Sequence, residues 1–252
     1  MKFIDTHAHI YDLTLPLVVE NAQRNDIQKI YMPNIEEETI ERMMDVAGDY
    51  PCCLPMMGIH PCHIRKDFTK QLYIVEEWLD KGGFIAVGEI GIDLYHDTAL
   101  LEAQQEAFSI QLSLAKRYHL PVSIHCRNAF KEVINLLEIE QDGSLKGVIH
   151  CFTGDLREAE KCIALDFSLG VGGIITIPKS GLAETISAID LKHLVLETDS
   201  PYLAPSPFRG KRNEPSYLRY IAEALATIKE VSLTEVASIT TQNAEAIFEA
   251  KR

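Results

Sequence analysis

The sequence lacks any run of apolar residues long enough to cross a bilayer, which argues against a helical membrane protein. It also lacks the pattern of a secretion leader, because Asp5 follows the first residues at once and no small-residue cleavage site appears. No low-complexity tract and no linker-like change of composition divides the chain. We therefore expect a single domain over residues 1–252, located in the cytoplasm, with no membrane contact and no obligate protein partner.

Positive charge is scarce in this chain. It has 24 Lys and Arg residues against 37 Asp and Glu residues, which gives a net charge of −13. This balance argues against a broad basic groove that neutralises many phosphates of a nucleic acid. A nucleic-acid substrate stays compatible with the sequence, because bound divalent metal ions supply positive charge locally.

The six cysteines are expected to be reduced thiols, because the chain is large and carries no secretion signal. An alternative is a small zinc site formed by Cys52, Cys53, Cys62 and His63. Two adjacent cysteines are a poor spacing for zinc ligands, which weighs against this alternative.

Apolar residues make up 46% of the chain, which is ample for a hydrophobic core. Eight short apolar segments alternate with helical patterns, which favours parallel strands joined by crossover helices. The expected strands begin at Phe3 and then cover residues 27–32, 54–57, 84–89, 122–125, 148–150, 167–171 and 194–197. The expected helices cover residues 14–24, 34–47, 72–81, 99–117, 155–165, 216–230 and 233–250. We expect an α/β fold, a single (β/α)8 TIM barrel, with a doubly wound open sheet as the alternative.

Metal-binding side chains follow or end several of the expected strands. His7 and His9 come after the first strand, two residues apart, and would project to the same side of an extended chain. The others are Glu89, His125, His150 and Asp199. Each of them alone is as readily a structural residue, but the strand ends of a barrel meet in one ring, so all six are expected to converge.

Four imidazoles and two carboxylates exceed the needs of one four-coordinate metal. They suffice for two ions if one carboxylate bridges them, and Glu89 is the candidate because it comes from a middle strand. Imidazole ligands favour zinc, whereas the carboxylates leave magnesium or manganese open. The sequence therefore predicts two divalent metal ions of undecided identity.

These residues lie in motifs that resemble the TatD family of metal-dependent deoxyribonucleases, within the amidohydrolase-like barrels. The motifs are Thr6-His7-Ala8-His9, Gly58-Ile59-His60-Pro61, Gly88-Glu89-Ile90-Gly91-Ile92-Asp93, Pro121-Val122-Ser123-Ile124-His125-Cys126-Arg127, His150-Cys151-Phe152-Thr153-Gly154, Glu197-Thr198-Asp199-Ser200-Pro201-Tyr202-Leu203-Ala204-Pro205 and Arg209-Gly210-Lys211-Arg212-Asn213-Glu214-Pro215. The resemblance runs along nearly the whole chain.

The resemblance implies a two-metal hydrolase that cleaves phosphodiester bonds of DNA, single-stranded or at strand ends, with a metal-activated water. It makes all six residues metal ligands and gives Asp199 and Glu89 the catalytic roles. It places His60, Asp93, Arg127 and Arg209 near the path of the phosphates. The sequence departs from the family after Asp93, where Leu94-Tyr95-His96 replaces a more aromatic and basic continuation, so the substrate preference stays open.

Several functional alternatives remain at this point. Arg127 holds a phosphate or forms a structural ion pair, and the cluster of Arg209, Lys211 and Arg212 contacts nucleic acid or is a solvated loop. Tyr95 and Tyr202 stack on bases or pack in the protein. The alternative enzyme is a small-molecule amidohydrolase, esterase or lactonase, which the negative charge favours. A metal-dependent binding protein without turnover is a third possibility, but a structural zinc does not need six ligands.

Overall fold

The computed structural model of the protein describes residues 1–95 and 98–249. Its strands form one eight-stranded sheet in which every strand pairs with the next in chain order, and every ladder is parallel. The strands are β1 Phe3–Asp5, β2 Ile27–Pro33, β3 Cys53–Met57, β4 Ala86–Asp93, β5 Val122–Arg127, β6 Gly147–Ile149, β7 Phe167–Val171 and β8 Leu194–Leu196. The Thr6 amide donates to the Leu196 carbonyl at 3.0 Å, and this bond brings the two edge strands together into a barrel.

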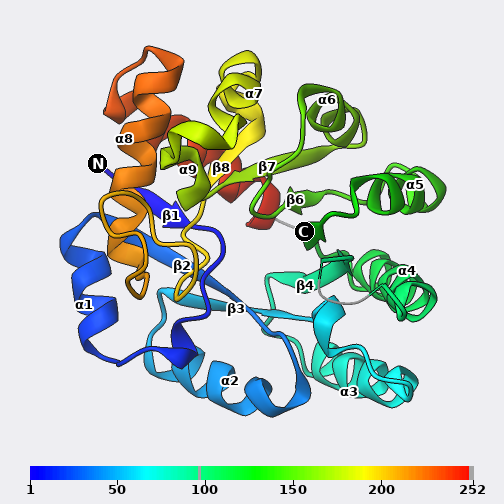
Figure 1. The fold of residues 1–252 in the computed structure, drawn as a ribbon. Helices are drawn as coiled ribbons and strands as arrows, with labels where there is room; N and C mark the ends of the chain where they lie inside the picture. The colour runs from blue at the N-terminus through cyan, green and yellow to red at the C-terminus, as the bar shows by residue number, and fades with distance from the viewer. Residues whose placement is uncertain (96–97, 250–252) are drawn as a thin grey trace.

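The helices surround this barrel, as Figure 1 shows in a view along its axis. They are α1 Leu17–Arg24, α2 Ile40–Asp49, α3 Phe68–Lys81, α4 Leu101–Tyr118, α5 Phe130–Glu140, α6 Leu156–Ala164, α7 Leu182–Ala188, α8 Leu218–Lys229 and α9 Leu233–Phe248. The predicted (β/α)8 barrel is confirmed, and the open doubly wound sheet is excluded. Across the described part of the chain, no helix is both long and apolar enough to span a membrane.

Helix α9 lies behind the strands in Figure 1, where it packs against β1 and β8. Its buried residues Ala244 and Phe248 form one apolar cluster with strand residues that include Ile4, Met56 and Val195. The Phe248 ring meets the ring of Tyr31 edge to face, with centroids 5.0 Å apart. The last helix therefore closes one end of the barrel and leaves the other end open.

The strand bounds differ from the prediction where polar residues continue a strand. We expected the fourth strand to end at Glu89, but β4 runs on to Asp93 and is buried throughout. The fifth strand likewise continues from His125 to Arg127. Periodicity could not show these extensions, because Glu89, Asp93 and Arg127 are charged residues that the open end of the barrel accommodates.

Two helices, α5 and α7, were not predicted. Helix α5 buries Val133, Ile134 and Leu137, a helical spacing that is present in the sequence. Helix α7 has seven residues and only Leu182 and Ile186 are buried, so its pattern is short.

Helix starts were predicted with mixed success. The helix expected from residue 155 starts with a capping box, in which the Asp155 and Glu158 side chains each accept the other's backbone amide at 2.8 Å. The expected start at residue 34 is wrong: helix α2 begins at Ile40, and the Asn34 side chain donates to the Gly58 carbonyl at 2.8 Å. The buried Asn34 amide thus links the end of β2 to the residue after β3 instead of capping a helix.

Phe248→Ala should destabilise the fold, because the Phe248 side chain is 4% exposed and its loss leaves a cavity between α9 and the barrel. We expect a loss of about 3 kcal/mol in the free energy of unfolding, measured by urea denaturation. Ile139→Ala is the control, since Ile139 is 77% exposed on α5. Equal unfolding midpoints for the two variants would contradict the closing role of α9.

Candidate metal centre

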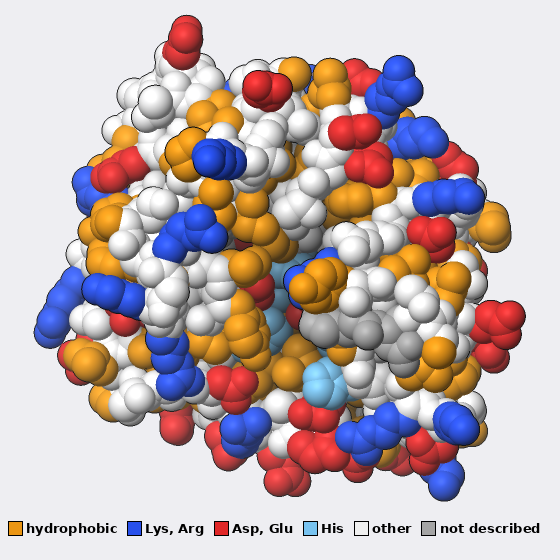
Figure 2. All heavy atoms as spheres, in the orientation of Figure 1, with side chains coloured by type: hydrophobic (Ala, Val, Ile, Leu, Met, Phe, Trp, Pro, Cys, Tyr) orange, Lys and Arg blue, Asp and Glu red, His pale blue; other side chains and the backbone are white. Residues whose placement is uncertain are grey.

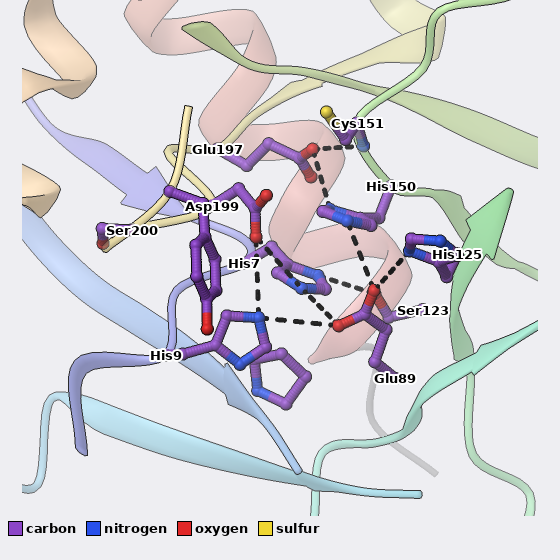
Figure 3. A network of polar contacts seen from close by, with 12 residues as sticks. His7, His9, Glu89, Ser123, His125, His150, Cys151, Glu197, Asp199 and Ser200 are labelled. Atoms are coloured by element: carbon purple, nitrogen blue, oxygen red, sulfur yellow. Dashed lines mark hydrogen bonds and ion pairs between the residues drawn. The ribbon is translucent and has the colours of Figure 1, made fainter. Parts of the chain in front are cut away.

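The C-terminal ends of the strands surround a cavity of about 790 Å³. Figure 2 shows histidine and carboxylate side chains inside this hollow. The structure brings together all six residues predicted as metal ligands, and Figure 3 shows them pointing toward one another. They are His7, His9, Glu89, His125, His150 and Asp199. Their role as ligands stays a prediction, but their convergence is a feature of the fold.

The Glu89 carboxylate lies at the centre of the group. Its Oε2 is 3.2 Å from His7 Nε2 and 3.5 Å from His9 Nε2. Asp199 Oδ1 completes this side, 3.5 Å from His9 Nε2 and 3.9 Å from His7 Nε2. Two ring nitrogens and two carboxylate oxygens therefore face a common point on one side of Glu89.

The second oxygen of Glu89 faces a different set of rings. Glu89 Oε1 is 2.8 Å from His125 Nδ1 and 3.4 Å from both His150 Nε2 and His60 Nε2. His60 was predicted only as a substrate contact, yet it lies inside the centre with His125 and Glu89. Each carboxylate oxygen of Glu89 thus serves its own cluster.

An irregularity in β4 places this carboxylate. The register between β4 and β5 shifts between Val87 and Ile90, and Glu89 lies in the irregular step. Its amide donates to the Asn34 carbonyl at 3.0 Å rather than to β5. Such irregular steps redirect a side chain out of the normal alternation of a strand. Glu89 can therefore reach the centre from the middle of a buried strand.

His7 and His9 are held between the first and last parts of the barrel. They follow β1 on a segment whose Ala8 pairs with Ser200 and donates to the Tyr31 carbonyl at 2.9 Å. The Asp199 amide donates to the His7 carbonyl at 2.9 Å. Asp199 itself has φ of 57°, a left-handed conformation that aspartate tolerates better than most residues.

The hydrogen bonds of His9 show which ring nitrogen carries its proton. The Tyr11 hydroxyl donates its one hydrogen to the Pro33 carbonyl at 2.7 Å, so it must accept from His9 Nδ1, which lies 2.9 Å away. The neutral His9 ring then has a lone pair at Nε2, directed at Glu89 and Asp199. Lone pairs facing carboxylate oxygens repel each other unless a cation or a proton lies between them. The donor set on this side therefore fits a divalent cation.

A buried carboxylate orients His150 in the same way. Glu197 Oε1 accepts from His150 Nδ1 at 3.1 Å and also from the Cys151 amide, while His150 Nε2 faces Glu89. The His150 ring stacks on His7 with centroids 3.6 Å apart. Hydrogen-bonded carboxylates of this kind commonly fix metal-binding imidazoles.

Burial and mutual charge set the protonation of the centre. Burial raises the pKa of Glu89, but the surrounding imidazoles, above all His60, outweigh this and hold the pKa well below its usual value. Burial likewise opposes ionisation of Asp199, yet the neighbouring imidazoles of His9, His150 and His7 leave its pKa lowered. Both carboxylates are thus ionised at neutral pH and ready to bind a cation.

The pKa values of the imidazoles shift in opposite directions. Burial lowers the pKa of His60 to about 4. For His150 burial also lowers the pKa, but the charges of Glu197 and Glu89 raise it to about 10. The pKa of His125 is raised as well, because its hydrogen bonds to Asp93 and Glu89 outweigh the lowering effect of burial.

The residues predicted to meet the substrate fall into separate places. Asp93 is buried and its Oδ2 is 2.9 Å from His125 Nε2. Arg127 lines the cavity with its guanidinium carbon 3.7 Å from the centroid of the Tyr95 ring. Arg209 lies outside this cavity and lines a neighbouring one. The departure from the family pattern at His96 lies outside the described residues.

Sequence reasoning assigned no role to the residues behind the ligands. Glu197 lies two residues before Asp199, and its carboxylate occupies space that Gly170 leaves free, since a Cβ there would be 2.3 Å from Glu197 Oε2. Tyr11 follows His9 by two residues, and the Ser123 Oγ lies 3.1 Å from His7 Nδ1. Ser123 likewise precedes His125 by two residues, so the repeated spacing of two residues from a predicted ligand was a signal that could have found all three.

The alternative zinc site at the cysteines is not supported. Among residues 1–95 and 98–249, the groups whose ligand atoms are close enough to share an ion contain only His, Asp and Glu. Cys62 and His63 line the cavity mouth, whereas Cys53 lies in the hydrophobic core.

Comparison with known proteins gives a consistent result. A family model described as TatD related DNase matches residues 4–249. The metal-dependent hydrolase YabD of Bacillus subtilis, described as uncharacterized, is 37% identical over 249 residues, which cover 97% of this chain and 98% of that protein. The 3'-5' ssDNA/RNA exonuclease TatD of Pantoea vagans is 33% identical over 220 residues, which cover 85% of this chain and 84% of that protein.

The solved structures include a similar protein. The crystal structure of YJJV, a TatD homolog from Escherichia coli, superimposes with a TM-score of 0.92 at 31% identity. The superposition covers 99% of this chain and 98% of that one.

Glu197→Gln should weaken metal binding, because the amide NH₂ group that replaces one oxygen either turns toward His150 Nδ1 or is buried without an acceptor. Glu197 Oε2 has no hydrogen-bond partner among the described residues. We expect the affinity for zinc or manganese to fall about 10- to 100-fold in a titration against a chelating dye. Glu158→Gln is the matched control, since Glu158 also accepts a backbone amide but lies on α6. A metal affinity equal to that of the control would show that Glu197 does not contribute to metal binding.

Proposed function

The chain belongs to the TatD-related DNase family of metal-dependent hydrolases, and on this basis we propose that it hydrolyses phosphodiester bonds of DNA with two divalent metal ions. The preferred substrate is single-stranded DNA or a strand end. Glu89 and Asp199 are 3% and 8% exposed at the bottom of the cavity, so a phosphate must enter the mouth to reach them. A single strand can do this, whereas a duplex must first be opened.

The observation that supports two ions is the division of Glu89 between two clusters. We assign His7, His9 and Asp199 with Glu89 Oε2 to one cation, and His125 and His150 with Glu89 Oε1 to the other. Glu89 would then contribute one oxygen to each ion. The imidazole-rich sets suit zinc, and the carboxylates also accept manganese or magnesium.

When bound, the cations supply a water of lowered pKa and stabilise negative charge on the phosphate oxygens. The protein residues position the reactants around them. Asp199 accepts the proton of the attacking water, since its carboxylate is ionised and lies beside His9. His60 and Arg127 line the cavity where the phosphate oxygens would lie, and Arg127 can bind them in a bidentate way. Asp93 acts through His125, whose ring it fixes.

The nucleic-acid substrate has a specific support besides the family. The relative from Pantoea vagans is named as an exonuclease of single-stranded DNA and RNA. The test is incubation of the metal-loaded protein with end-labelled single-stranded DNA, and separately with a panel of amides, esters and lactones. Metal-dependent cleavage of the DNA supports the proposal. Turnover of a small molecule alone would replace it with the amidohydrolase alternative.

Asp199→Ala should abolish most of the hydrolysis, because it removes both a ligand and the proton acceptor. We expect kcat on labelled single-stranded DNA to fall by about 10²-fold or more while the fold stays intact, as checked by circular dichroism. Asp190→Ala is a control, since Asp190 is exposed next to β8 and away from the cavity. Activity within a few-fold of the parent would exclude Asp199 from the mechanism.

Glu89→Gln should lower the number of bound metal ions, because an amide cannot bridge two cations with two anionic oxygens. Elemental analysis of the purified protein after dialysis against dilute metal should give fewer than two ions per chain. The parent protein, treated identically, provides the reference. Unchanged metal content in the variant would refute the bridging role.

A further inference from the structure

A second cavity adjoins the catalytic one. It has a volume of about 480 Å³ and shares three wall residues, Ile174, Tyr202 and Leu203, with the catalytic cavity. The Tyr202 ring is 51% exposed and lies 5.9 Å from the His9 ring, centroid to centroid. The second cavity therefore lies beside the cluster of His7, His9 and Asp199, and Tyr202 lines both cavities.

Its chemistry combines an apolar surface with cations. Ile177, Pro201 and Ala204 contribute apolar walls, and Arg209 and Lys211 contribute positive charge. No ion pair between described residues includes Arg209 or Lys211, whereas the Arg212 guanidinium donates to the Asp12 carbonyl. In Figure 2, Lys and Arg side chains lie to the left of the hollow, over the loop that follows β8. In a chain with a net charge of −13, two such cations beside the centre are available to a ligand.

The loop that forms this cavity is held in place before any ligand binds. Buried Asn213 donates to the carbonyls of Thr198 at 2.8 Å and Tyr202 at 2.6 Å, which fixes both ends of the loop. The Ser206 amide donates to Thr176 Oγ1 at 2.9 Å. Gly173 lets the wall approach closely, since a Cβ there would lie 2.1 Å from the Leu203 carbonyl oxygen. The walls are thus preorganised, which lowers the entropy cost of binding.

We propose that the second cavity is a subsite for the nucleotide next to the scissile phosphate, with its base on the apolar wall and its phosphate at Arg209 and Lys211. This inference rests on the proposed function and makes it more specific. A nucleotide offers a flat apolar face and an anionic group at one end, which match the two halves of the cavity. The continuity with the catalytic cavity across Tyr202 favours the neighbouring nucleotide of one strand over a separate ligand. The minimal good substrate then carries at least two phosphates.

The test compares two double variants. Arg209→Ala with Lys211→Ala removes the cations of the subsite. Arg24→Ala with Lys161→Ala is the control, because both residues are exposed in the last turns of α1 and α6, at the barrel end opposite the mouth. The substrates are a short single-stranded oligothymidylate and bis(4-nitrophenyl) phosphate, which has only one phosphate. The KM for the oligothymidylate, divided by the KM for the small diester, should rise about tenfold or more in the subsite variant and stay unchanged in the control.

Binding gives a readout that does not depend on turnover. In an Asp199→Ala background, the affinity for fluorescently labelled oligothymidylate is measured by anisotropy over a range of salt concentrations. Each phosphate contact to a single strand contributes about 0.7 to the slope of log affinity against log salt, so the subsite variant, which loses the one phosphate held by Arg209 and Lys211, should lose about 0.7 of this slope. A variant whose KM ratio and salt slope both equal those of the control would overturn the subsite while leaving the nuclease proposal standing. Failure of the parent to cleave either diester would overturn the nuclease proposal itself.

The apolar wall is tested separately with the parent protein. An abasic residue is placed directly on the 5′ side or on the 3′ side of one scissile phosphate in otherwise identical oligonucleotides. A base held by the wall predicts a raised KM for one of the two positions, and that position identifies which neighbour occupies the cavity. Equal KM values for both abasic substrates and the intact one would exclude the base from the cavity.

Discussion

The structure depends on a single buried carboxylate, Glu89, and on its contacts with imidazoles from several other strands and loops. An ionised group in a protein interior is costly unless it is paired, and Glu89 achieves this only when β1, β5 and β6 are all in place around β4. The bulged register of β4 and the close approach of Gly88, whose Cβ would lie 2.8 Å from the Ser123 Cβ, allow the carboxylate to reach the middle. The geometry of the centre is thus a property of the whole barrel.

Much of this could be predicted from the sequence, for a physical reason. Parallel strands joined by helices place their carboxyl ends at one face, so the sequence alone predicts that His7, His125, His150 and Asp199 meet. The local course of Glu89 could not be predicted, because an irregular step within a buried strand leaves no mark in apolar periodicity. The spacing of Glu197 from Asp199 marks Glu197 in the sequence, but the ring that it supports and the inclusion of His60 depend on which ring nitrogen faces which oxygen, and only the structure shows this.

The cluster of Arg209, Lys211 and Arg212 is a second case in which the sequence alone could not show the arrangement. In the sequence it reads as one basic patch, but the fold separates its members. Arg212 is tied to the Asp12 carbonyl, while Arg209 and Lys211 line a cavity of their own. Tertiary bonds of buried Asn213 and exposed Ser206 produce this division, and no spacing within the loop could reveal them.

The seam between the first and last strands has a consequence for synthesis in the cell. His7 and His9 lie on one side of it and Asp199 on the other, and the bond from the Thr6 amide to the Leu196 carbonyl crosses it. A nascent chain whose last quarter has not yet left the ribosome lacks a folded β8 segment. It therefore cannot assemble the cluster of His7, His9 and Asp199. The cluster of His7, His9 and Asp199 therefore cannot form in any copy that ends before Asp199, and a message that stops before this point yields a product without it.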